Sequence, residues 1–470
     1  MHFTEHARPH ASHMLRDVTF TPYWLATPRD PLPMLTGEAT ADLLIVGGGF
    51  TGLWAALLAR QRDLSRDIVV IDAERVGHAA SGRNGGFLHA SLTHGFANGL
   101  QRWPEEMSTL LRLGHENLGA IRATVEQYGI DCDWRDGGEL EVAFTAHDAE
   151  RIREHPALAA RHGERLQWLD AEQVRMRIDS PIALGAVFEP DGVALVDPAA
   201  LHRGLLDACR EQGIRVFEHT RLLDLESAGP GVLARTSFGG IRARRVLLAT
   251  NAARSPIASV RRRIVPVYDA VLVTEPLSSA QWNAVGWRGH EGLKGAGNRF
   301  HYARRTRDGR ILWGGFDALY HYGSAMGPHL EHDMPTYARL ADHFGTAFPQ
   351  LEGLRFTHAW AGAIDTCTRF TPFWTRAHHD RVVSVAGFTG LGVGASRFGA
   401  AVALDLLDDR SSEARALTMV RTRPIPFPPE PARSGVIRLT QRSLARADRD
   451  GGRRDPWLRL LDALHLGFDS

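Results

Sequence analysis

The sequence predicts an α/β fold, α+β overall, in which a Rossmann-like dinucleotide-binding domain is interleaved with a second domain built on a mixed sheet. Two observations predict the first domain: residues 41–59 and 381–407 each read as an apolar strand, a glycine-rich turn and a helix. A third predicts the second domain. Between these segments the chain runs through further strand-like stretches, 266–277 and 299–316, which do not continue the nucleotide-binding pattern.

The chain is organised around its first glycine-rich turn. Residues 41–46 predict a buried parallel strand, and Gly47, Gly49 and Gly52 follow in a Gly-x-Gly-x-x-Gly pattern that opens a helix. The first glycine permits the tight turn, the second lets a pyrophosphate approach the backbone, and the third lets the helix pack closely on the strand. The helix N-terminus then offers free N–H groups to the phosphates.

An acidic residue completes this fingerprint. A second apolar strand, residues 68–71, ends at Asp72, where a carboxylate can accept hydrogen bonds from a ribose. A glycine motif alone could be a plain turn without a ligand. Because two strands, a helix and an acid accompany it here, it predicts a bound dinucleotide, either FAD or NAD.

The loop after the second strand favours FAD. Residues 77–87 contain four glycines, which suits a backbone that runs along a flat ring. In this loop the chain resembles the FAD-dependent amine and amino-acid oxidoreductases of the D-amino-acid oxidase (DAO) superfamily. Residues 81–87, Ser-Gly-Arg-Asn-Gly-Gly-Phe, look like the branch of γ-glutamylputrescine oxidases and aminophosphonate oxidoreductase-like proteins.

The resemblance extends from residue 41 to residue 407 and implies a glutathione-reductase-type, DAO architecture. We expect an N-terminal arm at 1–40, an FAD-binding domain formed by 41–95, 180–255 and 356–410, a substrate domain formed by 96–179 and 256–355, and a C-terminal appendage at 411–470. The arm is expected to dock through Tyr23 and Trp24; a disordered leader is the alternative. The appendage begins with a proline-rich stretch and predicts one short helix near 457–464.

The resemblance also implies which residues hold the cofactor. The expected FAD-binding residues are Gly47, Gly49, Phe50, Thr51, Gly52, Asp72, Ala73, Ser81, Gly82, Arg83, Asn84, Gly85, Gly86, Phe87, Thr250, Asn251, Gly362, Gly387, Thr389, Gly390, Leu391 and Gly392. Some relatives attach the flavin through a His in the first loop, where this chain has Arg83. Others use a Cys before the last glycine turn, and Cys367 stands too close to that turn. Non-covalent FAD is therefore expected.

Candidate catalytic residues lie on segments that the resemblance places over the flavin. They are Arg83, Tyr268, His301, Tyr302 and Trp360, with Arg304, Phe316 and Asp365 as further candidates. His301 and Tyr302 are neighbours on a predicted strand, so only one of them should face the site. Arg83 and Asn84 either lie near the flavin or pair with loop carbonyls, and Asp365 either binds a substrate ammonium or is a structural acceptor. Leu391 replaces a His of sarcosine-oxidase-like relatives, which disfavours sarcosine.

Composition excludes several other classes. A composition of 44% hydrophobic and 23% charged residues is typical of a globular protein. A net charge of +1 does not favour nucleic acid as the main binding partner. No apolar run long enough to span a membrane and no export signal are visible, so a cytoplasmic location is expected. Three scattered cysteines predict neither a disulfide framework nor a metal site, and no metal is expected.

One compositional feature bears on the chemistry. Of the 55 basic residues only Lys294 is a lysine, and it lies outside the strand expected above the flavin, residues 310–314. Arginine stays protonated, so the proton acceptor should be His, Tyr, Asp, Glu or the substrate itself, and a catalytic lysine is not expected.

The leading hypothesis is an FAD enzyme that removes a hydride from a carbon bearing an amine. The imine is then hydrolysed to an aldehyde or keto compound, and oxygen takes the electrons to give hydrogen peroxide. The alternatives are an amine dehydrogenase with another electron acceptor, a non-catalytic maturation flavoprotein whose C-terminal appendage binds a partner, and an NAD-dependent dehydrogenase. The substrate is a small amine or amino acid, and the sequence indicates no oligomeric state.

Overall fold

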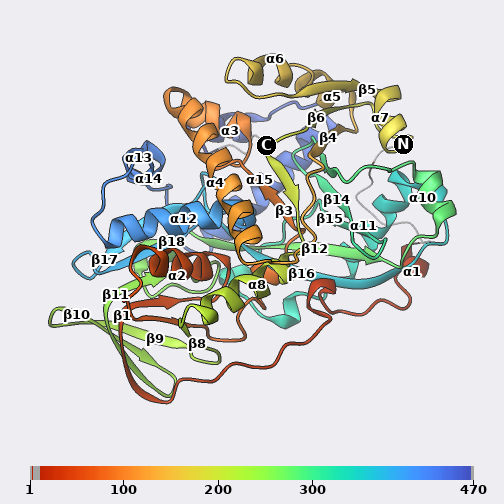
Figure 1. Cartoon of the computed structure of the whole chain (residues 1–470). Coiled ribbons are helices and arrows are strands. Elements are labelled where there is room, and N and C mark those ends of the chain that lie inside the picture. Colours follow the sequence, from red (N-terminus) through yellow and green to blue (C-terminus); the bar gives the residue numbers. More distant parts are fainter. Residues whose placement is uncertain (1–2, 4–10, 467–470) are drawn as a thin grey trace.

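The computed structural model describes residue 3 and residues 11–466, and two eight-stranded sheets form its framework (Figure 1). The first sheet has the order β17-β18-β11-β1-β2-β8, with β10 and β9 attached to β11. Its strands are β1 (Gly37–Val46), β2 (Ile68–Ile71), β8 (Arg215–Phe217), β9 (Leu222–Ala228), β10 (Gly231–Thr236), β11 (Gly239–Leu248), β17 (Phe373–Ala377) and β18 (Val382–Ala386). Strands β8, β2, β1, β11 and β18 run parallel, as the dinucleotide-binding prediction requires.

The central strand β1 is buried on both faces. Leu43 and Ile45 belong to one hydrophobic cluster, whereas Leu44 and Val46 belong to another on the opposite side. A strand covered on both sides needs a continuous apolar run, which is why its sequence does not alternate. The helices on the first side are α2 (Phe50–Arg62), α4 (Met107–Gln127), α8 (Pro198–Glu211) and α12 (Gly392–Leu407), with α2 packed between α8 and α12.

The second sheet has the order β16-β12-β15-β14-β13-β4-β6-β5 and is antiparallel except where β13 meets β4. Its strands are β4 (Glu139–Ala143), β5 (Gln167–Asp170), β6 (Gly185–Glu189), β12 (Val265–Thr274), β13 (Gly292–Gly295), β14 (His301–Arg305), β15 (Ile311–Gly315) and β16 (Phe356–Thr366). Helix α11 (Met334–Ala347) packs on β12 and β15 and joins them in one large hydrophobic cluster. The other face turns toward β3 (Phe87–His89), which pairs with β7 (Val193–Leu195).

Two strands lie outside the domain expected from the sequence. The ranges 180–255 and 356–410 were expected to belong wholly to the FAD-binding domain, but β6 and β16 within them pair with β4 and β12 of the second sheet. We therefore propose that each sheet is one domain, with β6 and β16 assigned to the second. Strand β1 also begins earlier than expected, at Gly37.

The described part of the N-terminal arm contacts the body through the two predicted aromatic residues. The Trp24 indole N–H donates to the Asn84 carbonyl (2.9 Å), and the Tyr23 hydroxyl donates to Asp308 (2.6 Å). The arm therefore reaches the loop that was expected to hold the flavin.

The C-terminal appendage is more helical than expected. The predicted short helix is α16 (Pro456–Ala463), but α15 (Ala432–Arg449), which the sequence analysis missed, precedes it. The remaining helices are α1 (Ala11–Met14), α3 (Phe96–Arg102), α5 (Ala146–Ile152), α6 (His155–Ala160), α7 (Ala171–Arg177), α9 (Ala258–Arg261), α10 (Ser279–Val285), α13 (Glu413–Ala416) and α14 (Thr418–Arg421). Among the described residues, none of these helices combines the length and the apolar composition that crossing a bilayer requires.

Candidate active site and cofactor cavity

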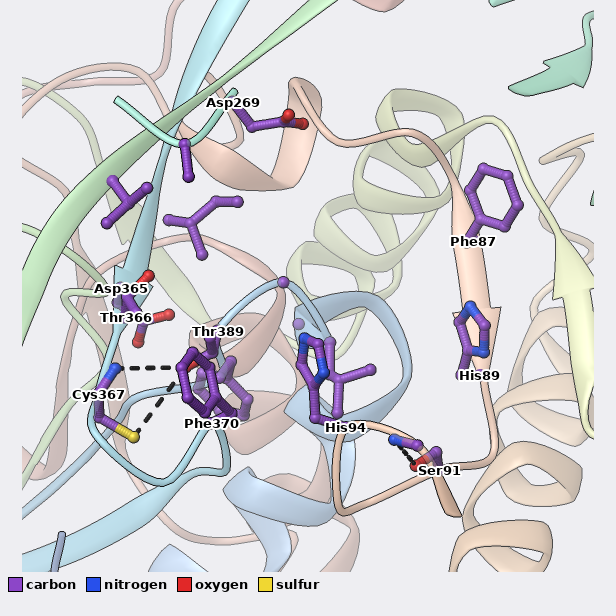
Figure 2. Close-up of a pocket in the computed structure, with 18 of the residues that line it drawn as sticks. Phe87, His89, Ser91, His94, Asp269, Asp365, Thr366, Cys367, Phe370 and Thr389 are labelled. Carbon is purple, nitrogen blue, oxygen red and sulfur yellow. Dashed lines mark hydrogen bonds between the residues drawn. The ribbon is translucent and has the colours of Figure 1, made fainter. Parts of the chain in front are cut away.

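A cavity of about 900 Å³ is lined by residues of both sheets, and this volume is in the upper part of the usual range for cofactor and ligand pockets. Its walls are the N-terminus of α2, the loop 80–87, the turn 388–393 and the inward face of the second sheet; Figure 2 shows part of this lining. Residues 436–444 of α15 also line it, so the appendage helps to enclose the cavity.

The glycines of the first turn occupy positions that a side chain would disrupt. Gly47 has a φ of +107°, and a Cβ added there would lie 2.3 Å from the Ala249 carbonyl oxygen. A Cβ added at Gly52 would lie 1.9 Å from the Gly47 carbonyl oxygen, which explains how α2 packs so closely on the turn. Gly49 lines the cavity as the residue before α2, and its neighbours Phe50 and Thr51 line it too.

Asp72 holds the glycine turn from outside the cavity lining. Its carboxylate accepts hydrogen bonds from the backbone N–H groups of Gly48 (2.8 Å) and Glu74 (2.9 Å). Burial raises its pKa above the ordinary value, although both hydrogen bonds oppose this. That Asp72 binds a ribose stays a prediction. The structure shows a second role, in which Asp72 holds the glycine turn in place.

The loop 80–87 is braced by its own side chains. The Asn84 amide donates to the Ala80 and Ser81 carbonyls (2.9 and 3.0 Å) and accepts from the Gly86 N–H (2.9 Å). Arg83 donates to the Ala361 carbonyl (3.0 Å) and pairs with Glu331. Both residues therefore make the local pairings that were the alternative to a flavin contact, and both also line the cavity.

Trp360 and Arg304, two residues expected over the flavin, support this loop from behind and do not line the cavity. The Trp360 indole donates to the Arg83 carbonyl (2.8 Å). The Arg304 guanidinium is fully buried and donates to the Gly86 (3.1 Å) and Val196 carbonyls. We therefore assign them a positioning role.

His301 lies on the opposite face of β14 from its neighbour Tyr302. It is 1% exposed, its ring stacks on Trp313 and Phe316, and one ring nitrogen lies 2.9 Å from a His343 ring nitrogen. The alternation of a strand thus excludes His301 from the cavity and turns Tyr302 into it. His301, one of the expected catalytic residues, thus lies outside the cavity lining, and the catalytic role of Tyr302 stays a prediction.

Tyr302 pairs with Asp269, which the sequence analysis did not single out. Strand β15 lies between the strands that carry Tyr302 and Asp269, and Gly314 of β15 stands opposite Tyr302. Because Gly314 has no side chain, the Tyr302 ring can pass over it; a Cβ there would lie 2.5 Å from the ring. The Tyr302 hydroxyl donates to Asp269 (2.6 Å). Burial raises the Asp269 pKa to about 6, although the Tyr302 hydrogen bond works against the rise, and burial also raises the Tyr302 pKa. The sequence did offer a signal for Asp269, because it is an acidic residue within the mostly apolar run 265–273.

Tyr268 and Phe316 line the same part of the cavity. The Tyr268 hydroxyl accepts a hydrogen bond from the Gly327 N–H (3.0 Å), which fixes the ring. Figure 2 shows Asp269 at the upper edge of the view, with Asp365 on one side and Phe87 on the other.

The last glycine turn is tied to β16. Asp365 accepts a hydrogen bond from the Gly387 N–H (2.6 Å), and burial raises its pKa to about 7 against that bond. The backbone N–H of Cys367 donates to the Thr389 hydroxyl (3.3 Å), and the buried Cys367 thiol donates to the Thr371 carbonyl (3.3 Å). Asp365 is thus engaged as a structural acceptor.

The expected cofactor residues divide into two groups. Those that line the cavity are Gly49, Phe50, Thr51, Ser81, Arg83, Asn84, Gly85, Phe87, Asn251, Gly362, Thr389, Gly390, Leu391 and Gly392. Those outside the lining are Gly47, Gly52, Asp72, Ala73, Gly82, Gly86, Thr250 and Gly387. The first group offers a glycine-rich backbone and a helix N-terminus in a cavity of sufficient size, so the residues present fit a dinucleotide.

Lys294 also lines the cavity. It lies on β13 directly opposite Tyr302 of β14, and its ammonium is 3.7 Å from a Glu139 carboxylate oxygen. The sequence analysis placed it outside the strand above the flavin, but the neighbouring strands of the same sheet form a continuous wall.

Known proteins resemble the chain in sequence and in fold. A family model described as FAD dependent oxidoreductase matches residues 42–406. Gamma-glutamylputrescine oxidoreductase of Escherichia coli is 28% identical over 402 residues, which cover 85% of this chain and 90% of that protein. An oxidoreductase named OrdL from Haemophilus influenzae is 28% identical over 374 residues, 77% of this chain and 81% of that protein. The crystal structure of glycine oxidase from Geobacillus kaustophilus has a TM-score of 0.69 at 19% identity, covering 82% of this chain and 100% of the other, so the fold is the same.

Proposed function

The chain belongs to the family of FAD dependent oxidoreductases, with FAD as its cofactor, and we propose that it oxidises a C–N bond of a small amine or amino acid. The observation that carries this proposal is the Asp269–Tyr302 pair, which lies in the same cavity as the glycine-rich loops. FAD, when bound, supplies the acceptor for a hydride from the carbon next to the amine nitrogen. Water then hydrolyses the imine to an aldehyde or keto compound.

The paired residues suit the proton chemistry of an amine. Hydride leaves readily from the neutral amine, because its lone pair supports the developing positive charge. An ionised Asp269 accepts a hydrogen bond from the substrate ammonium and can take its proton, and Tyr302 holds the carboxylate in place. Phe87 and Phe316 provide apolar surface beside the pair.

The experiment that tests the proposal mixes the yellow holoenzyme with amines and amino acids under anaerobic conditions. We expect at least one amine to bleach the oxidised flavin absorbance. Bleaching by none of a panel of polyamines, aminophosphonates and amino acids would contradict the proposal and favour a non-catalytic flavoprotein. Admitting oxygen afterwards identifies the acceptor: reoxidation as fast as turnover with stoichiometric peroxide supports our proposed oxidase, whereas slow reoxidation indicates another carrier.

We also predict that FAD is held without a covalent bond. Arg83 occupies the loop position of the His used by some relatives, and the Cys367 thiol is buried and hydrogen-bonded to backbone carbonyls. Protein precipitated with acid should therefore release its yellow colour into the supernatant. Colour that stays with the washed precipitate would show a covalent link.

A further inference from the structure

A charged cluster occupies the part of the cavity wall beyond Tyr302. In the register of the second sheet, Lys294 of β13 lies opposite Tyr302 on one side and opposite Glu141 of β4 on the other. Glu139, two residues before Glu141, shares its side of β4 and lies opposite Glu189 of β6. All five residues line the cavity, so one row of side chains leads from Tyr302 to the three glutamates.

The cluster carries more negative than positive charge. Lys294 is 3.7 Å from Glu139 and supplies one ammonium for three carboxylates. His89 lies 3.5 Å from Glu139, but burial lowers its pKa, so it stays neutral at pH 7. Although burial opposes the ionisation of Glu141, Lys294 and then His155 hold its pKa at about 2. Glu139 and Glu141 therefore share Lys294, and Arg151 adds a second positive charge near Glu141.

Glu189 is the carboxylate that this cluster leaves without a partner. It is partly exposed, lines the cavity, and makes no side-chain hydrogen bond or ion pair with any residue in the described part of the chain. A carboxyl group that faces a cavity without a protein partner can accept hydrogen bonds from a ligand, and such bonds are strong when the donor is charged. Glu189 therefore suits a ligand that carries hydrogen-bond donors and positive charge.

Apolar side chains also line the cavity beside the cluster. The Phe87 ring lies 5.8 Å from the Tyr302 ring and 6.2 Å from the His89 ring, so it separates the two polar ends. Figure 2 shows Phe87 and His89 side by side on β3. Further apolar side chains line the cavity from α3, α4 and the region of α6: Phe96, Met107, Leu111, Leu158, Ala159 and Leu166. Such surface suits a chain of methylene groups.

We infer that Glu139 and Glu189 form a subsite for a second ammonium group, so that the substrate is an extended diamine or polyamine with one amine at Asp269 and another at this cluster. This inference rests on the proposed amine oxidation and specifies its substrate class. The distal ammonium donates hydrogen bonds to the two carboxylates, and the methylene chain lies along Phe87. Lys294 keeps Glu141 ionised.

Proton release provides a signature of this subsite. Burial, and then the Glu139 charge, raise the Glu189 pKa to about 8, so the group is mostly protonated at pH 7 in the absence of ligand. A bound cation favours the ionised form, so a diamine should displace this proton and bind more tightly as pH rises toward 8. The charged and titratable groups that face Glu189 or its cluster are Glu139, Glu141, Lys294, Arg151, Glu164, His115, His89 and His155.

The test compares α,ω-diaminoalkanes with the n-alkylamines of the same chain length on the oxidised holoenzyme under anaerobic conditions. Calorimetry gives affinity and, from buffers of different ionisation enthalpy, proton release; stopped-flow absorbance gives flavin reduction. We expect the best diamine to bind roughly ten- to a hundredfold more tightly than its monoamine, as one charge-assisted hydrogen-bonded pair implies. At pH 7 its binding should release close to one proton.

Glu189→Gln should abolish both the preference and the proton release while leaving monoamine binding unchanged. Glu172→Gln is the matched control, because it makes the same substitution at an exposed position on α7, away from the cavity. Equal affinity for diamines and monoamines, or a preference that survives Glu189→Gln and Glu139→Gln, would overturn the inference. If the inference fails but monoamines still reduce the flavin, the proposed amine oxidation stands. If a diamine binds tightly but does not reduce the flavin, the subsite is supported and the proposed amine oxidation is contradicted.

Discussion

Replacing Gly49 by valine is expected to give a folded protein that has lost most of its FAD. Gly49 has a φ of −79°, which any residue adopts, and the only atom that an added Cβ would meet is the Ser81 hydroxyl oxygen at 2.9 Å. The chain can accommodate valine when the short Ser81 side chain shifts, which weakens the hydrogen bond that Ser81 accepts from the Phe50 N–H (2.9 Å). A phosphate approaching the α2 N-terminus cannot, because the branched side chain fills the space where it must contact the backbone.

The steric cost of the valine side chain against the phosphate, about 1–3 kcal/mol, corresponds to FAD binding that is weaker by up to roughly a hundredfold. The measurements are the flavin-to-protein absorbance ratio after purification and the FAD dissociation constant by fluorescence quenching. Gly119→Val is the control, because Gly119 is exposed on α4 with open space around its Cβ position. Gly52→Ala should instead prevent folding, since its Cβ would lie 1.9 Å from a backbone oxygen. Full flavin occupancy in Gly49→Val would mean that the motif is a plain turn.

The sequence predicted the nucleotide-binding half of the fold because that half is encoded locally. Gly47 and Gly52 sit where a Cβ would strike backbone atoms, and the apolar run of β1 reflects burial on both faces. Such constraints limit which residue type can stand at each of these positions, so they are visible in the sequence. The family resemblance, the fold class and the FAD cofactor were confirmed for the same reason.

The substrate half depends on strand register, which a single sequence does not state. Tyr302 meets Asp269 only because Gly314 lies between them, and Lys294 joins the wall only because β13 pairs with β14 and β4. The local sequence around each of these residues does not indicate the contact that it makes. Strand alternation did predict that His301 and Tyr302 would separate, but not which of the two faces the cavity.

Helix α15 was missed for a different reason. Its sequence is rich in arginine, and its apolar residues are interspersed with polar ones, so it resembles a solvated segment. Residues Val436, Ile437 and Leu444 nevertheless line the cavity together with Thr440 and Gln441. Burial against a distant part of the chain, rather than its own composition, explains why this helix packs on the body.

Replacing Asp269 by asparagine is expected to slow flavin reduction at pH 7 by roughly a hundred- to ten-thousandfold, the range for losing a general base. Asparagine keeps an oxygen that can accept the Tyr302 hydrogen bond but cannot take a proton. Two opposing effects act on stability. Burial raises the Asp269 pKa to about 6, so the carboxyl disfavours folding once pH exceeds its ordinary pKa, and the neutral amide removes that cost. The backbone N–H groups of Gly315 and Ala270 also donate to the carboxylate, and the amide NH2 group cannot accept from them.

The pH profile distinguishes this role from a structural one. In the unmodified enzyme, flavin reduction by a bound amine should increase with pH through about 6, as Asp269 ionises. Tyr302→Phe removes a hydrogen bond that lowers the Asp269 pKa, so the rise should move to higher pH while the rate at alkaline pH is largely retained. Asp224→Asn, at an exposed position on β9, is the control. A profile that Tyr302→Phe leaves in place, or an Asp269→Asn enzyme that reduces its flavin at the normal rate with an unchanged Tm, would remove Asp269 from the reaction.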